Sequence, residues 1–271
     1  MVLERYPEAL GFFADLQDTM NLLTPSKFIG FANVDWDHLV VYQDPSGAGL
    51  CLFEASDGFS GETITVHGNE RVNVEAWQVV PGVVELTVLD DYGEVLTKVL
   101  AWVNDPMMYP VYPLKEVGEP ARYRDYRVGA IAVDVKVYES VDEWQAAQEP
   151  IKVGDFSERK KSKTLPSEAY VGPEFISSPW LFSMYSGEAR VEDVSPISIF
   201  KAVCSDVQIV TNGLTGKQWY KVGASCGIPV TLALPIDTTP APHPGSVVDG
   251  KAFLCGSTGV WNHCDSERLV L

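Results

Sequence analysis

The sequence predicts a mainly β protein: an N-terminal helix and an antiparallel β-meander, followed by a small β-barrel. Short apolar runs alternate with Gly, Pro and Asn turn residues over 195–261, and a similar alternation runs from residue 28 to residue 103. Such spacing is typical of consecutive antiparallel strands. A third observation, a change in charge balance near residue 152, divides the chain into two parts.

The first predicted element is a helix over residues 7–23. Pro7 suits the first helical turn, where its missing N–H costs nothing, and Glu8 complements the positive end of the helix. Apolar residues recur at three- and four-residue spacing from Leu10 to Leu23, which gives the helix one apolar face. The Thr-Pro pair that follows ends it.

The meander follows the helix. Val72, Val74 and Ala76 alternate with polar neighbours, so one face of their strand is expected to point into a core. The Asp-Pro-Ser-Gly sequence at 44–47 is a good β-turn and joins two strands into a hairpin. The predicted strands span residues 28–34, 38–42, 50–54, 63–67, 72–80, 83–89 and 95–103.

Two elements close the first part of the chain. A strand pair is predicted over residues 123–128 and 130–138, because Ile131 and Val133 begin a clear alternation in the second run. Residues 140–148 form a predicted short helix with Ser140 as its N-cap.

The strands of the second part follow a definite order. After a first strand or lead-in at 187–191, a long strand over 200–211 passes through a hairpin turn at 212–216 into residues 217–222. Further strands are predicted at 228–234 and, after a proline-rich loop, at 244–254. In this order residues 187–261 resemble an OB-fold, the small five-stranded Greek-key barrel. The resemblance implies a binding role, although such barrels host many functions.

Charge is distributed unevenly along the 271 residues, whose net charge is −17. Residues 1–150 carry 25 Asp/Glu and 9 Lys/Arg, a net of −16, whereas residues 151–271 carry 12 and 11, a net of −1. We therefore predict an acidic α+β meander domain over 1–151, a basic linker or long loop over 152–165 and an OB-like barrel domain over 166–271. The negative charge argues against nucleic acid and anionic membranes as partners.

The apolar runs are too short to span a membrane, and the start of the chain lacks the pattern of a secretory signal. We therefore expect a soluble cytoplasmic protein. Its five cysteines are odd in number and show no C-x-x-C spacing, so free and mostly buried thiols are expected.

The first candidate site combines Asp35, Asp37 and His38 with Glu54 on the paired strand. In an extended strand Asp35 and Asp37 share one face, and Trp36 and His38 share the other. Two carboxylates could hold a hard cation, and His38 with Glu54 could form a metal-binding or acid–base pair. The alternative is the polar start of a strand with a hydrogen-bonded histidine, and no catalytic residue is assigned.

A second candidate is a group of possible zinc ligands near the C-terminus. Its spacing fits no zinc finger, knuckle or ribbon, so ordinary core thiols are expected and neither a metal nor another cofactor is predicted. The residues are Cys226, His243, Cys255, His263 and Cys264.

The third candidate is a set of aromatic and basic residues on the predicted barrel, which could bind a ligand. Strand aromatics beside lysines also occur in proteins that bind single-stranded nucleic acid, and the alternative is core packing. Adjacent residues point to opposite faces of a strand, so at least one of the first two aromatics belongs to the core. The set is Trp219, Tyr220, Lys217, Lys221, Lys251 and Phe253.

Common enzyme motifs for nucleotide binding, serine hydrolysis and zinc proteolysis do not occur in the sequence. We therefore expect a non-catalytic binding or interaction protein whose partner is a small molecule or another protein. Two alternatives stay open: a metal-assisted hydrolase-type enzyme that uses the Asp35–His38 region with Glu54, and a barrel that binds single-stranded nucleic acid. Exposed sheet edges must be covered, and homo-oligomerisation is one way to cover them.

Overall fold

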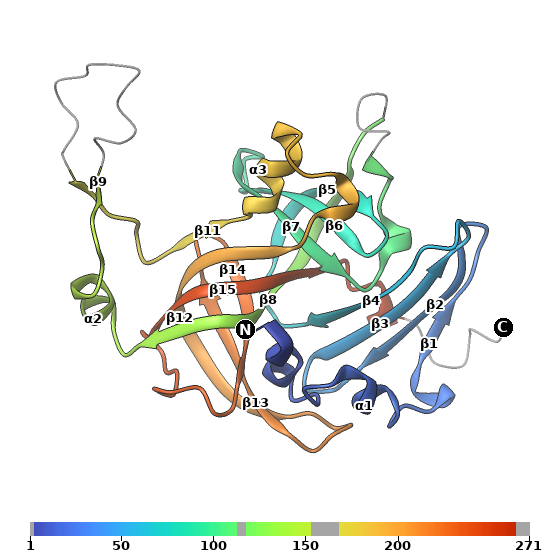
Figure 1. Cartoon of the computed structure of the whole chain (residues 1–271), viewed down its shortest axis with the longest axis horizontal. Coiled ribbons are helices and arrows are strands. Elements are labelled where there is room, and N and C mark those ends of the chain that lie inside the picture. The colour runs from blue at the N-terminus through green and yellow to red at the C-terminus, as the bar shows by residue number, and fades with distance from the viewer. Residues whose placement is uncertain (1–2, 113–117, 153–167, 264–271) are drawn as a thin grey trace.

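The computed structural model describes residues 3–112, 118–152 and 168–263, and the chain is mainly β, as predicted. A small antiparallel sheet contains, in spatial order, β1 (Ile29–Phe31), β2 (Trp36–Gln43), β3 (Ala48–Ala55) and β4 (Ser60–Val66). A nine-stranded sheet contains β11 (Phe175–Ser177), β12 (Ile197–Thr211), β13 (Gln218–Ser225), β14 (Pro229–Pro235), β8 (Ala121–Tyr138), β15 (Val247–Ser257), β7 (Val95–Val103), β6 (Val83–Leu89) and β5 (Val72–Val80). A separate pair is formed by β9 (Ile151–Lys152) and β10 (Glu168–Ala169) (Figure 1).

Two additional pairings close the large sheet on itself. Because β12 pairs with β15 as well as with β13, strands β12, β13, β14, β8 and β15 form one closed ring. Because β8 pairs with β5, strands β5, β6, β7, β15 and β8 form a second ring. The antiparallel ladder between β8 and β15 belongs to both rings, and closure gives each ring strand a partner on both sides over at least part of its length.

The first ring contains the region predicted to resemble an OB-fold, but one of its strands comes from elsewhere in the chain. Strand β8 pairs in parallel with β14 and antiparallel with β15, so hydrogen bonds join residues on both sides of the predicted linker. The OB-fold assignment and the division at 152–165 stay predictions, and 153–167 lies outside the described residues. The predicted lead-in at 187–191 is not a strand: Gly187 caps a helix there.

The predicted strand pair at 123–128 and 130–138 is wrong, because these residues form the single strand β8. Gly129 does not turn the chain but lies within the ladders, opposite Cys255 and Thr231. A Cβ atom at Gly129 would lie 2.5 Å from Val66 Cγ1 and 2.7 Å from the Val66 carbonyl oxygen on β4, so the glycine permits close packing between the two sheets. The pattern of a turn residue between two apolar runs therefore has a packing cause here.

The predicted helix over 7–23 is also interrupted. A 3₁₀ helix, η1 (Leu3–Leu10), is followed by the short helix α1 (Leu16–Met20). Gly11 separates them with φ +69°, and a Cβ atom there would lie 2.8 Å from the Lys217 carbonyl oxygen. The apolar side chains of this segment are used in a turn that packs against β8, β13 and β14 instead of a regular helix.

The remaining helices are short. Ser140 caps α2 (Val141–Ala146) as predicted, because its Oγ accepts from the Glu143 N–H at 3.1 Å. Helix α3 (Pro179–Ser186) packs against β7 and β12. The 3₁₀ helices are η2 (Pro25–Lys27), η3 (Pro106–Met108), η6 (Val191–Asp193) and η7 (Val260–His263). Within the described ranges, no helix is both long and apolar enough to cross a membrane.

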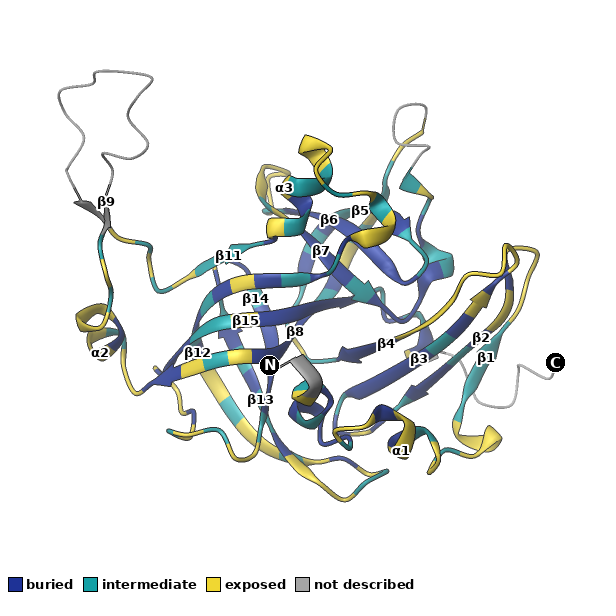
Figure 2. Ribbon diagram, viewed as in Figure 1, coloured by how far each residue is buried: buried dark blue, intermediate teal, exposed yellow. Residues whose placement is uncertain are grey.

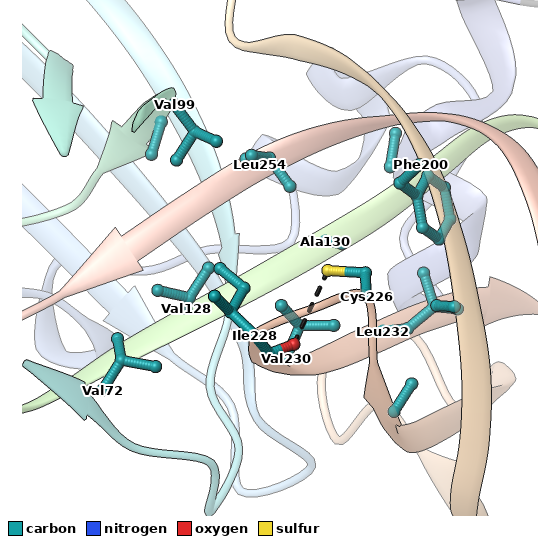
Figure 3. Close-up of a cluster of buried hydrophobic side chains, with 14 of the residues drawn as sticks. Val72, Val99, Val128, Ala130, Phe200, Cys226, Ile228, Val230, Leu232 and Leu254 are labelled. Atoms are coloured by element: carbon teal, nitrogen blue, oxygen red, sulfur yellow. Dashed lines mark hydrogen bonds between the residues drawn. The ribbon is translucent and has the colours of Figure 1, made fainter. Parts of the chain in front are cut away.

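Strand β8 separates two cores, because successive residues face opposite sides. Val128 and Ala130 point into a cluster shared by both rings, together with Phe200 and Leu254 (Figure 3). Ile131 joins a second cluster between the large sheet, the small sheet and the N-terminal segment. Figure 2 shows that the strands at this junction are mostly buried, whereas the polar loops lie outside. The two sheets and the N-terminal segment are thus joined by shared apolar burial.

Candidate functional site

A cavity of about 260 Å³ lies where the turn between β2 and β3 meets the large sheet. Positively charged side chains gather around it, although the chain as a whole is strongly acidic. We call this cavity the cation pocket and define it by four residues. They are His67, Arg71, Arg127 and Lys221.

Each cation comes from a different element. Arg71 lies in the loop just before β5, Arg127 lies on β8, and Lys221 lies on β13. Because β8 pairs with β14 and β14 pairs with β13, the ladders of the first ring fix the separation of the last two. Asn262 of η7 lines the same cavity and completes its wall.

The three permanent cations are held by neutral oxygen atoms. Lys221 Nζ donates to the Ser46 carbonyl at 3.0 Å, and Arg71 Nη1 donates to the Gly68 and Glu70 carbonyls at 3.0 and 2.8 Å. Asn262, with its amide oxygen facing Arg127, accepts from Nη1 and, at 2.8 Å, from Nη2. Among the residues that the structure describes, none of the three forms an ion pair within 4.0 Å.

Burial and mutual repulsion act on these cations in the same direction. The pKa of Lys221 is lowered, first by burial and then by the charge of Arg127. The pKa of Arg127 is lowered by burial and by the charge of Arg71. Both shifts mean that the surroundings disfavour the positive charge, so an anion in the pocket would offset a cost already present in the empty protein.

Asp44 also lines the cavity, but its carboxylate is used within its own turn and the neighbouring hairpin. It accepts from Tyr42 Oη at 2.6 Å, from the Ser46 N–H at 2.9 Å and from the Gly213 N–H at 2.8 Å. Burial alone would raise the pKa of Asp44, but these donors outweigh burial and the pKa is lowered. The carboxylate therefore serves as an anchor that positions the β2–β3 turn.

His67 forms the inner wall of the pocket. Its Nε2 lies 3.1 Å from Thr65 Oγ1 and 3.0 Å from Asn104 Nδ2, while its buried Nδ1 has no hydrogen-bond partner among the described residues. Burial, followed by the charges of Arg127 and Lys221, lowers the pKa of His67 to about 3. The imidazole is therefore neutral at physiological pH, and the permanent charge of the pocket comes from the other three residues.

This shift predicts a loss of stability in acid. The folded pKa of about 3 lies below the ordinary value of 6.5, so the unfolded chain binds a proton first as the pH falls. The contribution of His67 to the free energy of unfolding is complete above pH 6.5 and declines toward pH 3. The loss is about 2 kcal/mol between pH 6.5 and pH 5. Urea unfolding at several pH values measures it: the pH slope should shrink in His67→Gln but not in His38→Gln, an exposed control. Equal slopes in both variants would contradict the shift.

A larger hollow, of about 850 Å³, lies beside β5, the β6–β7 turn and the start of β8. Its charges are largely satisfied within the protein. Arg122 forms an ion pair with Glu75 at 3.0 Å, and Asp90 Oδ1 accepts from the Tyr92 and Glu94 N–H groups. Its volume exceeds that of the cation pocket, but it lacks the same excess of one charge.

The residues of the first predicted site lie on the small sheet. His38 and Glu54 face each other in the register of β2 and β3, as the predicted hairpin requires. A bulge between Trp36 and His38 changes the alternation, so Trp36 is buried whereas Asp37 and His38 are both exposed, and Asp35 is exposed beside them. The predicted sharing of a face by Trp36 and His38 is therefore wrong. A catalytic or metal-binding role for this group stays a prediction.

The predicted ligand set on the barrel is not gathered on one surface. Trp219 is fully buried in the second core, Phe253 is stacked on Trp102, and Tyr220 packs against the first core. Lys217 lies over the ring of Phe13, and Lys251 is exposed on β15. Only Lys221 reaches the cation pocket. Core packing thus accounts for two of the three aromatics, and a ligand role for the set as a whole stays a prediction.

The four cysteines that the structure describes are free and buried, as the sequence predicts. They are Cys51, Cys204, Cys226 and Cys255, whereas Cys264 lies outside the described residues. The part of the chain that the structure describes brings together no group of three or more His, Cys, Asp or Glu residues in a geometry suited to a metal ion.

Sequence reasoning missed Arg71, Arg127, His67 and Asn262. His67 and Arg71 lie four residues apart, but long stretches of chain separate them from Arg127, Lys221 and Asn262, so no local motif connects the whole set. One signal was present: Arg122, Arg124 and Arg127 form a basic group within the acidic half of the chain. The fold directs the last of these alone into the cation pocket.

The cation pocket can hold and orient an anion, because it offers two guanidinium groups, an ammonium group and an amide within one cavity. Its neutral histidine adds no charge. Comparison of the chain with protein-family models, with curated proteins and with solved structures finds no match.

Proposed function

We propose that this protein binds a small anionic ligand in the cation pocket. The observation that carries the proposal is the convergence of Arg71, Arg127 and Lys221 on one cavity, where each is held only by neutral oxygen atoms within the described residues. The sequence predicts only a binding role, whereas the cation pocket specifies the class of ligand, a small anion, and the place where it binds.

The electrostatics of the pocket support an anion as the occupant. Three cations in one partly buried cavity repel one another, and burial first and this repulsion second lower the pKa values of Lys221 and Arg127. A structural role for the cations would be served better by carboxylate partners, as in the part-buried pair of Lys201 and Asp249 at 2.5 Å. The positive charge in the pocket is left for a ligand instead.

The surroundings favour a small ligand over a polyanion. A cavity of about 260 Å³ accommodates a compact molecule. Asp44, Glu70 and Asp206 lie at or beside its wall, and the chain carries a net charge of −17. A nucleic acid that entered with one phosphate would bring its other phosphates close to these acidic groups. Like charges repel over about 8–10 Å before salt screens them, so this approach would be unfavourable.

Calorimetric titration with inorganic phosphate in low-salt buffer tests the proposal. We expect saturable binding by the wild-type protein and binding at least about tenfold weaker in Lys221→Met, because a hydrogen bond to a charged group is worth roughly 1.5–3 kcal/mol. Lys251→Met is the matched control, since it removes the same charge from an exposed site on β15. Absence of binding to the wild-type protein, or equal weakening in both variants, would contradict the proposal.

A further inference from the structure

Asn262 holds Arg127 without neutralising it. With its amide oxygen toward the guanidinium, the side chain accepts from both terminal nitrogens of Arg127. An aspartate, which has nearly the same shape, would form a bidentate ion pair with Arg127 in this position and would neutralise its positive charge within the protein. The neutral amide fixes the direction of the arginine and leaves its charge available.

The same arrangement is repeated at the other two cations. Carbonyl oxygens of Gly68 and Glu70 hold Arg71, and the carbonyl of Ser46 holds Lys221. The pocket therefore presents three oriented positive charges from three separate elements. In addition, no hydrogen bond within the described residues uses the backbone N–H groups of Gly68 and Asn69, in the loop that lines the pocket.

We infer that the cation pocket takes a phosphate group carrying two negative charges, as the free ion or as a monoester, and that Asn262 is a positioning residue that reserves Arg127 for it. This inference rests on the proposed anion-binding function and specifies its ligand. A phosphate monoester offers three terminal oxygens to donors from three directions, and its charge is nearly −2 at neutral pH. A carboxylate offers two oxygens in one plane and a single charge, so it cannot engage the three cations equally.

Titrations with four small anions at pH 8 separate this inference from the proposed function. Methyl phosphate and inorganic phosphate should bind at least about tenfold more tightly than dimethyl phosphate, which has the same tetrahedral shape but one charge, and than acetate. Tighter binding of methyl phosphate than of inorganic phosphate assigns the site to a monoester, and the reverse assigns it to the free ion. Equal binding of all four anions would overturn the inference but leave the anion-binding function standing, whereas absence of binding by all four would overturn both.

Asn262→Asp tests the role of the amide. The new carboxylate should act as a built-in anion beside Arg127, so methyl phosphate should bind at least about tenfold more weakly. The ligand-free variant should have a higher Tm at low salt, because the carboxylate offsets repulsion among the cations, and the increase should shrink as salt is added. Loss of a merely structural hydrogen bond would lower the Tm instead.

Two further variants complete the design. Gln145→Glu adds the same negative charge at an exposed position of α2 and should change neither the binding of methyl phosphate nor the salt dependence of the Tm. Asn262→Ala removes the hydrogen bond without adding charge and should weaken binding less than Asn262→Asp does. Unchanged binding in Asn262→Asp, or equal losses in the aspartate and alanine variants, would overturn the role of Asn262.

Discussion

Replacement of Asp105 by alanine should lower the free energy of unfolding by about 3–5 kcal/mol, because it removes a fully buried acceptor at the centre of a hydrogen-bond network. Asp105 accepts from Tyr109 Oη at 2.8 Å and from both the N–H and Oγ1 of Thr258, each at 2.7 Å. Through Thr258 it fastens the segment after β15 to the segment after β7. Without it, the buried Tyr109 hydroxyl and the part-buried donors of Thr258 would lose their shared acceptor.

Asp105→Asn is the informative control. Burial raises the pKa of Asp105, although its hydrogen bonds oppose the shift, so a neutral side chain avoids the cost of burying charge. The asparagine oxygen can still accept from Thr258, and its NH₂ group can donate to Tyr109 Oη if that hydroxyl donates to Tyr126 Oη, 2.9 Å away. We therefore expect a loss of less than about 1.5 kcal/mol, compared by urea or thermal unfolding. Equal losses in the two variants would show that the acceptor at this position does not matter.

Gly250→Ala should be comparably severe, with a loss of about 3 kcal/mol or more, because a side chain has no room there. Gly250 has φ +155°, and a Cβ atom would lie 2.1 Å from the Asp134 carbonyl oxygen on β8. It is paired with Phe200 of β12 on one side and with Val135 of β8 on the other. The strain would therefore fall on the ladder through which β15 helps to close the first ring.

Gly216→Ala separates the steric effect from the backbone effect. Gly216 also has positive φ, at +74°, but no atom lies within 4 Å of an added Cβ. We expect a loss of roughly 1 kcal/mol from the strained backbone alone. Chemical unfolding of both variants measures the difference. Similar losses at the two positions would mean that the close approach of β15 to β8 is relieved easily.

The N-cap of α2 and the strands of the meander could be predicted from residues close together in the sequence. Strands β5, β6 and β7 begin and end at the predicted residues, because alternation of apolar side chains and intervening turn residues determines them without help from distant parts of the chain. Ser140 is an N-cap for the same reason, since its partner lies three residues away.

Elements whose conformation depends on distant contacts were predicted less well. The apolar spacing over 7–23 fits a helix, but Gly11 instead adopts a turn against the Lys217 carbonyl. The alternation at 123–138 fits a hairpin, but Gly129 packs against Cys255, which lies far along the chain. In both cases the sequence pattern does not reveal that the glycine is needed because residues distant in the chain pack against it.

The sequence by itself determined the mainly β class, the positions of most strands, the free state of the four described cysteines and the concentration of negative charge in the first half. These features depend on composition and on short-range periodicity. Only the tertiary structure decided that β8 closes two rings and that Arg71, Arg127 and Lys221 share one cavity. The physical reason is that burial of both faces of β8 determines which distant strands pair with it. The same burial determines the direction of each side chain across those ladders, and no local pattern does so.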